Sequence, residues 1–192
     1  MIADGTRGDV PVSATAYAAA LTSEGLGSLI DAFTVNPFTG RDSIEPFVEA
    51  ASASGSGIFV LVRTSNPGAV DFQDLEVSGT PLHMEVAAMV GEFAGRLEGD
   101  SGLSGMGAVV GATRPQHLAE IRRLLPRSIF LIPGVGAQGG RAEDLASAFS
   151  PGRAGALVNA SRSIAGAEDP RRAAEDLRET LWEVSGATSR DA

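Results

Sequence analysis

The stretch Ile58-Phe59-Val60-Leu61-Val62 is an uninterrupted run of apolar residues, four of which are β-branched or aromatic. A short run of this kind, bounded by turn residues, is typical of a strand that is buried on both faces of a parallel sheet. It is followed by residues 63–68, a polar segment that contains one proline and one glycine. The pattern therefore predicts a buried parallel strand with a polar loop at its carboxyl end.

The same unit, a strand followed by a helix, recurs along the chain. We expect strands to begin near residues 2, 32, 58, 106, 129 and 155. Helical periodicity follows them over residues 13–29, 43–53, 83–97, 115–125, 141–149 and 170–184. Asp42 or Ser43 is expected to cap the second of these helices. Strict alternation predicts parallel strands joined by right-handed crossovers, in one domain over residues 1–186 with a disordered tail over 187–192.

Two α/β architectures fit this alternation, a doubly wound open sheet and a (β/α)8 barrel of the TIM type. Polar residues and glycines follow all six expected strands. A barrel takes its site from the ends of many strands, whereas an open sheet uses one switch point, so the barrel is favoured. A complete barrel has eight units in about 250 residues. Six units in 192 residues predict an incomplete barrel, and because only residues 1–3 precede Asp4, we expect two amino-terminal units to be absent.

Composition excludes several kinds of chemistry. The net charge of −9 argues against a nucleic-acid surface. The chain has no cysteine, which excludes disulfides and cysteine-bound metals, and all 15 basic residues are arginine. Without lysine there can be no Schiff base, phosphate-loop lysine or lysine proton donor. No apolar run reaches the roughly 18–20 residues of a membrane helix, and no signal peptide is visible, so we expect a cytoplasmic protein that does not bind membranes.

The loop at residues 133–140 follows the fifth strand and contains Gly134, Gly136 and Gly139 in the spacing G-x-G-x-x-G. A dinucleotide site would need an acid at the end of the next strand, which instead ends in residues 159–162 without one. The loop is therefore better suited to binding one phosphate through backbone N–H groups, with Ser161 and Arg162 beside it. Plain glycine turns with a surface arginine are the alternative.

The segment Met1–Val10 places two acids around a glycine-rich turn. Strand alternation predicts that Asp4 and Thr6 share a face while Arg7 points the other way. The turn can bring Asp9 back towards them, and two carboxylates in one small site repel each other. In the alternative interpretation, Asp4 is a turn residue and Asp9 a helix cap.

Taken together, these stretches resemble the longer, bacterial-type branch of the orotidine 5'-phosphate decarboxylase family. The likeness runs in order from Ile2 to about Gly166. Its first part resembles the signature Asp-x-Lys-x-x-Asp, with Asp4 and Asp9 as the acids and Thr6 in place of the lysine. The other matching pieces are Asp31–Ser43, Val60–Gly68, Val110–Pro115, Pro133–Gly140 and Val158–Arg162.

The resemblance implies a set of functional residues. Its catalytic positions are Asp4, Thr6 and Asp9, and its substrate-binding positions are Ser13, Thr64, Ser65, Gln138, Gly139, Ser161 and Arg162. Gln138 and Arg162 resemble the pair that grips the phosphate, and Ser65 the part that faces the pyrimidine. Ser13 stands where the family has threonine, and with Asp9 it would reach into the partner's site of a homodimer with shared active sites.

The resemblance also implies a reaction that needs neither metal nor cofactor. The family removes CO2 from C6 of orotidine 5'-phosphate to form UMP, using a carboxylate against the departing carboxylate and a cation that protonates the C6 carbanion. Asp4 and Asp9 can supply the first, but Thr6 is neutral. The family's ribose-binding aspartate and second lysine lie on its first two strands, which have no counterpart here.

Three hypotheses follow. The chain is a carboxy-lyase of pyrimidine biosynthesis, or it is a catalytically silent truncated homologue that binds a nucleotide phosphate or pairs with an intact subunit. The third is another phosphosugar barrel enzyme, such as a pentulose phosphate epimerase that uses acids and a metal. His83 and His117, the only histidines, both lie in predicted helices, so we expect them to pack at the surface or in the core and not to bind a metal.

Overall fold

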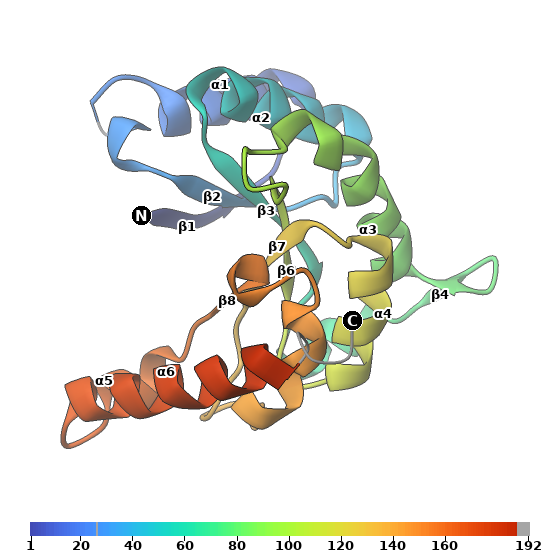
Figure 1. Ribbon diagram of the computed structural model, residues 1–192. Coiled ribbons are helices and arrows are strands. Elements are labelled where there is room, and N and C mark those ends of the chain that lie inside the picture. Colours follow the sequence, from blue (N-terminus) through green and yellow to red (C-terminus); the bar gives the residue numbers. More distant parts are fainter. Residues whose placement is uncertain (26, 188–192) are drawn as a thin grey trace.

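The computed structural model describes residues 1–25 and 27–187. In this part of the chain six parallel strands form one curled sheet in the order β1-β2-β3-β6-β7-β8 (Figure 1). Their bounds are β1 Ile2–Arg7, β2 Ala32–Val35, β3 Gly57–Arg63, β6 Ser104–Val110, β7 Ser128–Ile132 and β8 Ala156–Val158. Within this sheet each strand pairs with the one that follows it in the order above. This leaves β1 and β8 as edges of the described sheet. The predicted incomplete barrel of six units is confirmed.

Helices join the strands and cover the outer face of the sheet (Figure 1). The α-helices are α1 Pro11–Thr22, α2 Arg41–Ser54, α3 Leu82–Phe93, α4 Pro115–Leu124, α5 Ser161–Ala165 and α6 Pro170–Ala187. Shorter 3-10 helices are η1 Gly27–Leu29, η2 Pro67–Asp71, η3 Ala94–Leu97, η4 Ala142–Phe149 and η5 Arg153–Gly155. A small antiparallel hairpin of β4 Glu76–Val77 and β5 Thr80–Pro81 lies between β3 and α3. None of the described helices is both long and apolar enough to cross a bilayer.

The position of β3 in the sheet explains why its central residues are all apolar. Ile58, Val60 and Val62 belong to the main core beneath the helices. Phe59 and Leu61 point to the opposite face, where they join a second and smaller cluster on the inner side of the curled sheet. Phe59 is buried and Leu61 is half-buried on this face, so the strand needs apolar residues on both sides, as its sequence predicts.

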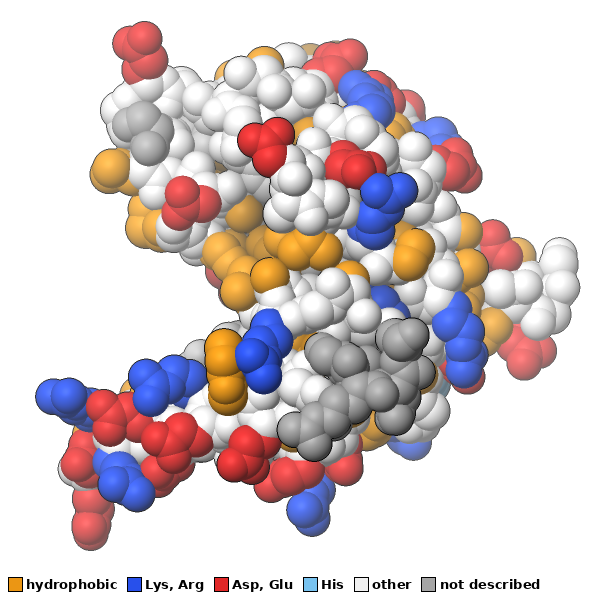
Figure 2. All heavy atoms as spheres, in the orientation of Figure 1, with side chains coloured by type: hydrophobic (Ala, Val, Ile, Leu, Met, Phe, Trp, Pro, Cys, Tyr) orange, Lys and Arg blue, Asp and Glu red, His pale blue; other side chains and the backbone are white. Residues whose placement is uncertain are grey.

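The inner face of the sheet is only partly covered by the described residues. It borders an open cavity of about 400 Å³ whose lining includes Met1, Ile2, Ala32, Phe59, Ile129 and Leu157. Figure 2 shows hydrophobic side chains along the hollow that separates the β1 side of the molecule from the side formed by β8 and α6. Leu157 of β8 is 47% exposed. The inside of the barrel is thus an accessible apolar surface.

Two helix boundaries differ from the sequence expectation. The first helix, expected over residues 13–29, begins at Pro11 and ends at Thr22, because Ser23 is extended and Gly25 has a φ of +89°. Leu26, which the periodicity places in that helix, lies outside the described residues. The second helix begins at Arg41 after Gly40, so Asp42 and Ser43 lie inside its first turn and neither is the cap.

Other differences concern the ends of elements. The segment expected as one helix over 83–97 divides into α3 and η3, and the helix expected over 141–149 is the 3-10 helix η4. Helix α5 and the β4–β5 hairpin were not predicted. Helix α6 continues to Ala187, the first residue of the expected tail, and residues 188–192 lie outside the described part of the chain.

Candidate active site at the carboxyl ends of the strands

The loops that follow β7 and β8 line one small cavity of about 150 Å³. Gln138 comes from the first loop, and Ser161 and Arg162 are the first two residues of α5, which begins directly after the second loop. The sequence places these residues about twenty positions apart, and the parallel neighbouring strands bring them together. Gly139 belongs to the same turn, where its N–H donates to the carbonyl of Gly136 (2.8 Å), but it does not line the cavity.

The glycine loop depends on backbone conformations that other residues rarely adopt. Gly134, Gly136 and Gly139 have φ angles of +101°, +77° and +90°. A Cβ added to Gly136 would also lie 2.8 Å from Oγ of Ser163. The spacing of glycines in the sequence is therefore explained by the shape of this loop.

Ser65, in the loop that follows β3, lies against the glycine loop. Its hydroxyl donates to Oε1 of Gln138 (2.8 Å). A Cβ on Gly134 would lie 2.8 Å from Cβ of Ser65, and one on Gly111 would lie 2.7 Å from its Cα. Two glycines thus allow the loop after β3 to approach the loops after β6 and β7, and Thr113 donates to the Ser65 carbonyl (3.4 Å).

Thr64 serves the loop itself and does not line the cavity. Its N–H donates to Oε1 of Gln73 (2.8 Å), and its hydroxyl donates to Oδ1 of Asn66 (2.6 Å). These bonds fix the backbone on which Ser65 is carried. Thr64 and Ser65 are both predicted to bind substrate, and of the two only Ser65 bonds to a residue that lines the cavity.

A second cluster forms where β1 and β2 end. The hydroxyl of Thr34 donates to Oδ1 of Asp4 (2.9 Å), and the N–H of Thr6 donates to Oγ1 of Thr34 (2.8 Å). The Thr6 hydroxyl lies 3.5 Å from Oδ1 of Asp4, so the two residues share a face as predicted. Thr34 is buried and was not expected in the site, although a hydroxyl within an apolar strand was a signal for it.

Asp9 does not join the Asp4 cluster. Its carboxylate accepts the N–H of Val10 (2.7 Å), and its carbonyl accepts the hydroxyl of Thr39 (3.3 Å). Val10 is the N-cap of α1, and no side chain makes a capping hydrogen bond there. Asp9 therefore stabilises the turn before this helix but is not the helix cap that the alternative interpretation expected. Ser13 lies half-buried in the first turn of α1. Within the described chain, neither residue forms a hydrogen bond or ion pair with Asp4 or Thr6.

The backbone of β1 is irregular between Ala3 and Arg7, where its pairing register with β2 shifts. Thr6 has a φ of +44°, which is unusual for a β-branched residue. Irregular strand ends of this kind redirect side chains next to active sites. Arg7 turns towards α1, where its guanidinium lies over the ring of Tyr17 at 5.7 Å from the centroid.

Comparison with known proteins decides the family. The family model described as "Orotidine 5'-phosphate decarboxylase / HUMPS family" matches residues 1–177. The chain belongs to this family. The resemblance to the orotidine 5'-phosphate decarboxylase family is therefore confirmed.

Named members of the orotidine 5'-phosphate decarboxylase family show how much of the fold is present. The Rhodopirellula baltica protein is 46% identical over 192 residues, which cover 95% of this chain and 62% of the relative. The structure of Leishmania donovani OMP decarboxylase matches with a TM-score of 0.75 and 34% identity, over 96% of this chain and 68% of that chain. The Methanocaldococcus jannaschii enzyme, solved with the inhibitor BMP, matches with a TM-score of 0.73 and 26% identity, over 94% of this chain and 72% of that chain.

This chain therefore spans only about six tenths of the length of its curated relatives, for example 62% of the Rhodopirellula baltica protein. The match supports the curled, barrel-type sheet as a part of the orotidine 5'-phosphate decarboxylase fold.

Proposed function

We propose that this chain acts in the decarboxylation of orotidine 5'-phosphate to UMP and CO2, as a carboxy-lyase of de novo pyrimidine biosynthesis. The observation that carries the proposal is the meeting of Gln138 and Arg162 at one cavity, with Ser65 bonded to Gln138. Two side chains from separate βα units, one of them a cation, suit a phosphate dianion at the ends of the last two strands. The relatives named above support the choice of substrate.

We assign a different task to each residue of the proposed phosphate site. Arg162 binds two phosphate oxygens through its planar guanidinium. The Ser65 hydroxyl donates a hydrogen bond to Oε1 of Gln138, and this orients the amide N–H groups of Gln138 to donate to the phosphate. The glycine loop adds backbone N–H groups. Because the phosphate is far from C6, phosphate binding stabilises the ground state and the transition state equally.

Asp4 is the residue we place against the departing carboxylate. Its own carboxylate, oriented by the Thr34 hydroxyl, repels the carboxylate on C6, and loss of CO2 relieves this repulsion. Asp9 and Ser13 act in the partner's site of a homodimer with shared active sites. The engagement of Asp9 with its own turn, and not with Asp4, supports this assignment.

The protonation step is where this chain differs from its family. Thr6 is neutral and a poor acid, and the chain contains no lysine to replace it. We therefore expect slow turnover and intact phosphate binding. We further propose that the protein is cytoplasmic, that its substrate is a pyrimidine nucleotide monophosphate, and that the reaction needs neither metal nor cofactor. We also propose that it binds neither membranes nor nucleic acid. The net charge of −9 supports the absence of nucleic-acid binding.

The test combines binding and turnover. UMP is titrated by calorimetry into the purified chain and into Arg162→Gln, with Arg141→Gln as a control that removes another exposed arginine outside the cavity. Orotidine 5'-phosphate is then added, and the loss of pyrimidine absorbance is followed. We expect the wild type and R141Q to bind UMP and R162Q to bind at least tenfold more weakly.

The outcomes separate the hypotheses. Binding together with measurable decarboxylation supports the proposed activity. Binding without turnover identifies a silent homologue that retains the phosphate site. If UMP does not bind, or if R162Q binds as well as R141Q, the proposed phosphate grip is wrong.

A further inference from the structure

Behind Ser65 lies a group of charged and titratable side chains that does not touch the phosphate cavity. Arg63, at the end of β3, is 3% exposed and donates two hydrogen bonds to Asp74, from Nε to Oδ1 (2.7 Å) and from Nη2 to Oδ2 (2.9 Å). The same guanidinium donates to the carbonyl of Thr64. A buried arginine is thus held between a carboxylate and the loop that carries Ser65.

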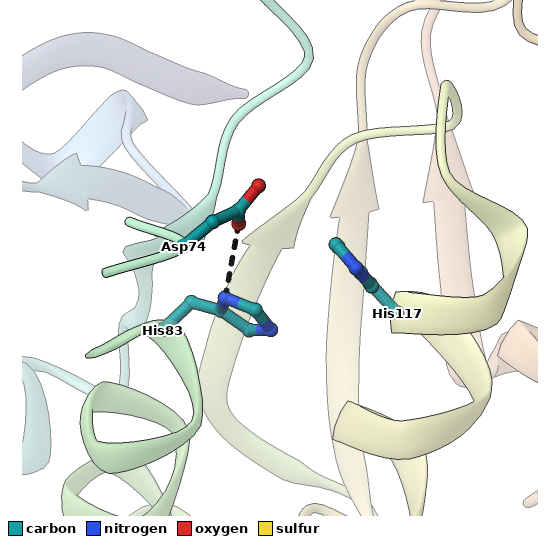
Figure 3. Close-up of side chains that lie close together, drawn as sticks. All are labelled: Asp74, His83 and His117. Atoms are coloured by element: carbon teal, nitrogen blue, oxygen red, sulfur yellow. Dashed lines mark ion pairs between the residues drawn. The ribbon is translucent and has the colours of Figure 1, made fainter. Parts of the chain in front are cut away.

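Asp74 also connects this loop to α3 (Figure 3). Its Oδ1 lies 3.3 Å from Nδ1 of His83, in the first turn of α3, and this Nδ1 lies 2.9 Å from the carbonyl of Gln73. The ring of His117, in the first turn of α4, stacks on His83 with centroids 4.8 Å apart. The expectation that the histidines pack in the core holds for His83, which is 2% exposed, and their stacking was not predicted.

The arrangement favours a structural clamp over a metal site. Asp74, His83 and His117 offer ligand atoms within 4.8 Å of one another. However, the two rings stack with only 29° between their planes, so their in-plane lone pairs do not converge on one point as metal ligands must. Both oxygens of Asp74 are already bound to Arg63, whose positive charge would oppose a cation.

We propose that Asp74 is a positioning residue that holds the loop after β3 in the conformation in which Ser65 reaches Gln138. The path has few steps. Asp74 fixes the guanidinium of Arg63, Arg63 holds the carbonyl of Thr64, and Ser65 follows directly in the chain. The neighbouring Gln73 receives the N–H of Thr64 at 2.8 Å, so the residue before Asp74 holds the other side of the same peptide segment.

The physical need for such a clamp is clear from the loop itself. Asn66, Pro67 and Gly68, which follow Ser65, are exposed, and so they contribute little buried area to hold it. A binding residue must be kept within a fraction of an ångström of its working position by the residues that support it. The Arg63 hydrogen bonds hold the pKa of Asp74 below its usual range, so the carboxylate is charged at neutral pH. This inference rests on the proposed function for its consequence, but not for its geometry.

The test uses Asp74→Asn, which keeps the shape of the side chain and removes its charge. Glu98→Gln is the matched control, because Glu98 also pairs with an arginine, Arg127 (2.7 Å), away from the site. Amide hydrogen exchange and UMP affinity are measured for both. We expect D74N to show faster exchange at Thr64 and its neighbours, with exchange in the other strands unchanged, and UMP affinity lower by about tenfold or more.

Asp74→Glu provides a second variant if D74N does not fold. It retains the charge but displaces it by one methylene, so we expect an intermediate rise in exchange over residues 64–74. Unchanged exchange at Thr64 in both variants would overturn the proposal. So would a uniform rise over the whole chain, because that describes a general loss of stability.

The two proposals can fail separately. If the wild type does not bind UMP, the proposed function is wrong, and the exchange at Thr64 still decides whether Asp74 holds the loop. If the wild type binds UMP and D74N loosens the loop without changing affinity, the clamp exists but does not position the site, and this inference is wrong.

Discussion

Thr6 has a φ of +44°, and its hydroxyl lies 3.2 Å from that of Thr34 and 3.5 Å from Oδ1 of Asp4. A left-handed conformation costs an L-residue roughly 1–2 kcal/mol, and branching at Cβ adds to the crowding. The conformation is held by the bond from the Thr6 N–H to Thr34. The backbone thus aims position 6 at Asp4, while the side chain found there carries no charge.

Restoring the charge at this position is the first prediction. In Thr6→Lys, an ammonium placed beside Asp4 can stabilise the C6 carbanion and then donate a proton to it. We expect the rate of orotidine 5'-phosphate decarboxylation to rise by about 10²–10⁴-fold, the usual range for a positioned general acid. The measurement is the initial loss of pyrimidine absorbance.

A charge added elsewhere serves as the control for T6K. Thr180→Lys, on α6, introduces the same side chain outside the candidate site. Equal rates in T6K, T180K and the wild type would show that the lysine position alone does not limit this chain.

His117 makes stability depend on pH. Its pKa lies below the usual 6.5, first because burial disfavours the charged ring, then because of His83 and Arg63, with Asp74 and Glu120 opposing the shift. As the pH falls, the unfolded chain therefore takes up this proton before the folded chain does. The contribution of neutral His117 is fully present above pH 6.5 and is lost as the pH falls from 6.5 towards the lower folded-state pKa.

The corresponding variant is His117→Gln. Urea denaturation between about pH 7.5 and 5 should show the wild type losing stability below pH 6.5, with a smaller loss in H117Q because this titrating ring is absent. Parallel pH profiles for the two proteins would contradict the assignment.

At the scale of elements, Arg122 joins the base of the barrel. It is 4% exposed, and its guanidinium lies 3.6 Å from the centroid of the Phe130 ring. Its two Nη atoms donate to four carbonyls, from the residue that follows α4 and from β7, η4 and η5: those of Leu125, Ser128, Ala148 and Gly155. Burial without a carboxylate lowers the pKa of Arg122 to about 10, so it is still charged at neutral pH.

Replacing Arg122 therefore tests how these elements are held together. In Arg122→Met the four carbonyls lose a charged donor, and we expect the free energy of unfolding to fall by roughly 3 kcal/mol or more. Urea denaturation gives this value, and Arg123→Met, at the exposed neighbouring position, should change it by less than about 0.5 kcal/mol. Similar losses in both variants would mean that the carbonyl contacts do not stabilise the fold.

At the scale of the molecule, the described sheet has two unpaired edges and an accessible apolar inner face. Unpaired strand edges beside exposed apolar surface promote association between chains. We expect the weight-average mass in analytical ultracentrifugation to rise with protein concentration. Leu157→Lys, which charges the inner face at β8, should reduce this rise.

The control for L157K is Leu124→Lys on α4. The two leucines have similar exposure, 47% and 43%, but Leu124 lies on a helix and not on the inner face of the sheet. If L124K reduces association as much as L157K does, the inner face is not the surface responsible.

Much of the fold follows from local patterns. A strand such as β3 is recognisable because burial on both faces requires apolar residues at every position, and that requirement is written in consecutive residues. Helix ends were less predictable. Gly40, which precedes α2, and Gly25, which follows α1, have positive φ angles, and these set the helix ends without the side-chain caps that the sequence suggests. Gln138, Ser161 and Arg162 meet at one cavity, as expected, because neighbouring parallel strands end at the same edge.

The sequence by itself determined the family, the parallel α/β plan and the absence of a lysine at position 6, since each depends on residue identity and order alone. Only the tertiary structure decided that Thr34 orients Asp4, that Asp9 bonds to its own turn, and that Asp74 joins Arg63 to His83, on which His117 stacks. The physical reason is that these contacts depend on side-chain direction and on the packing of separate βα units. Neither is specified by a pattern within one stretch of chain.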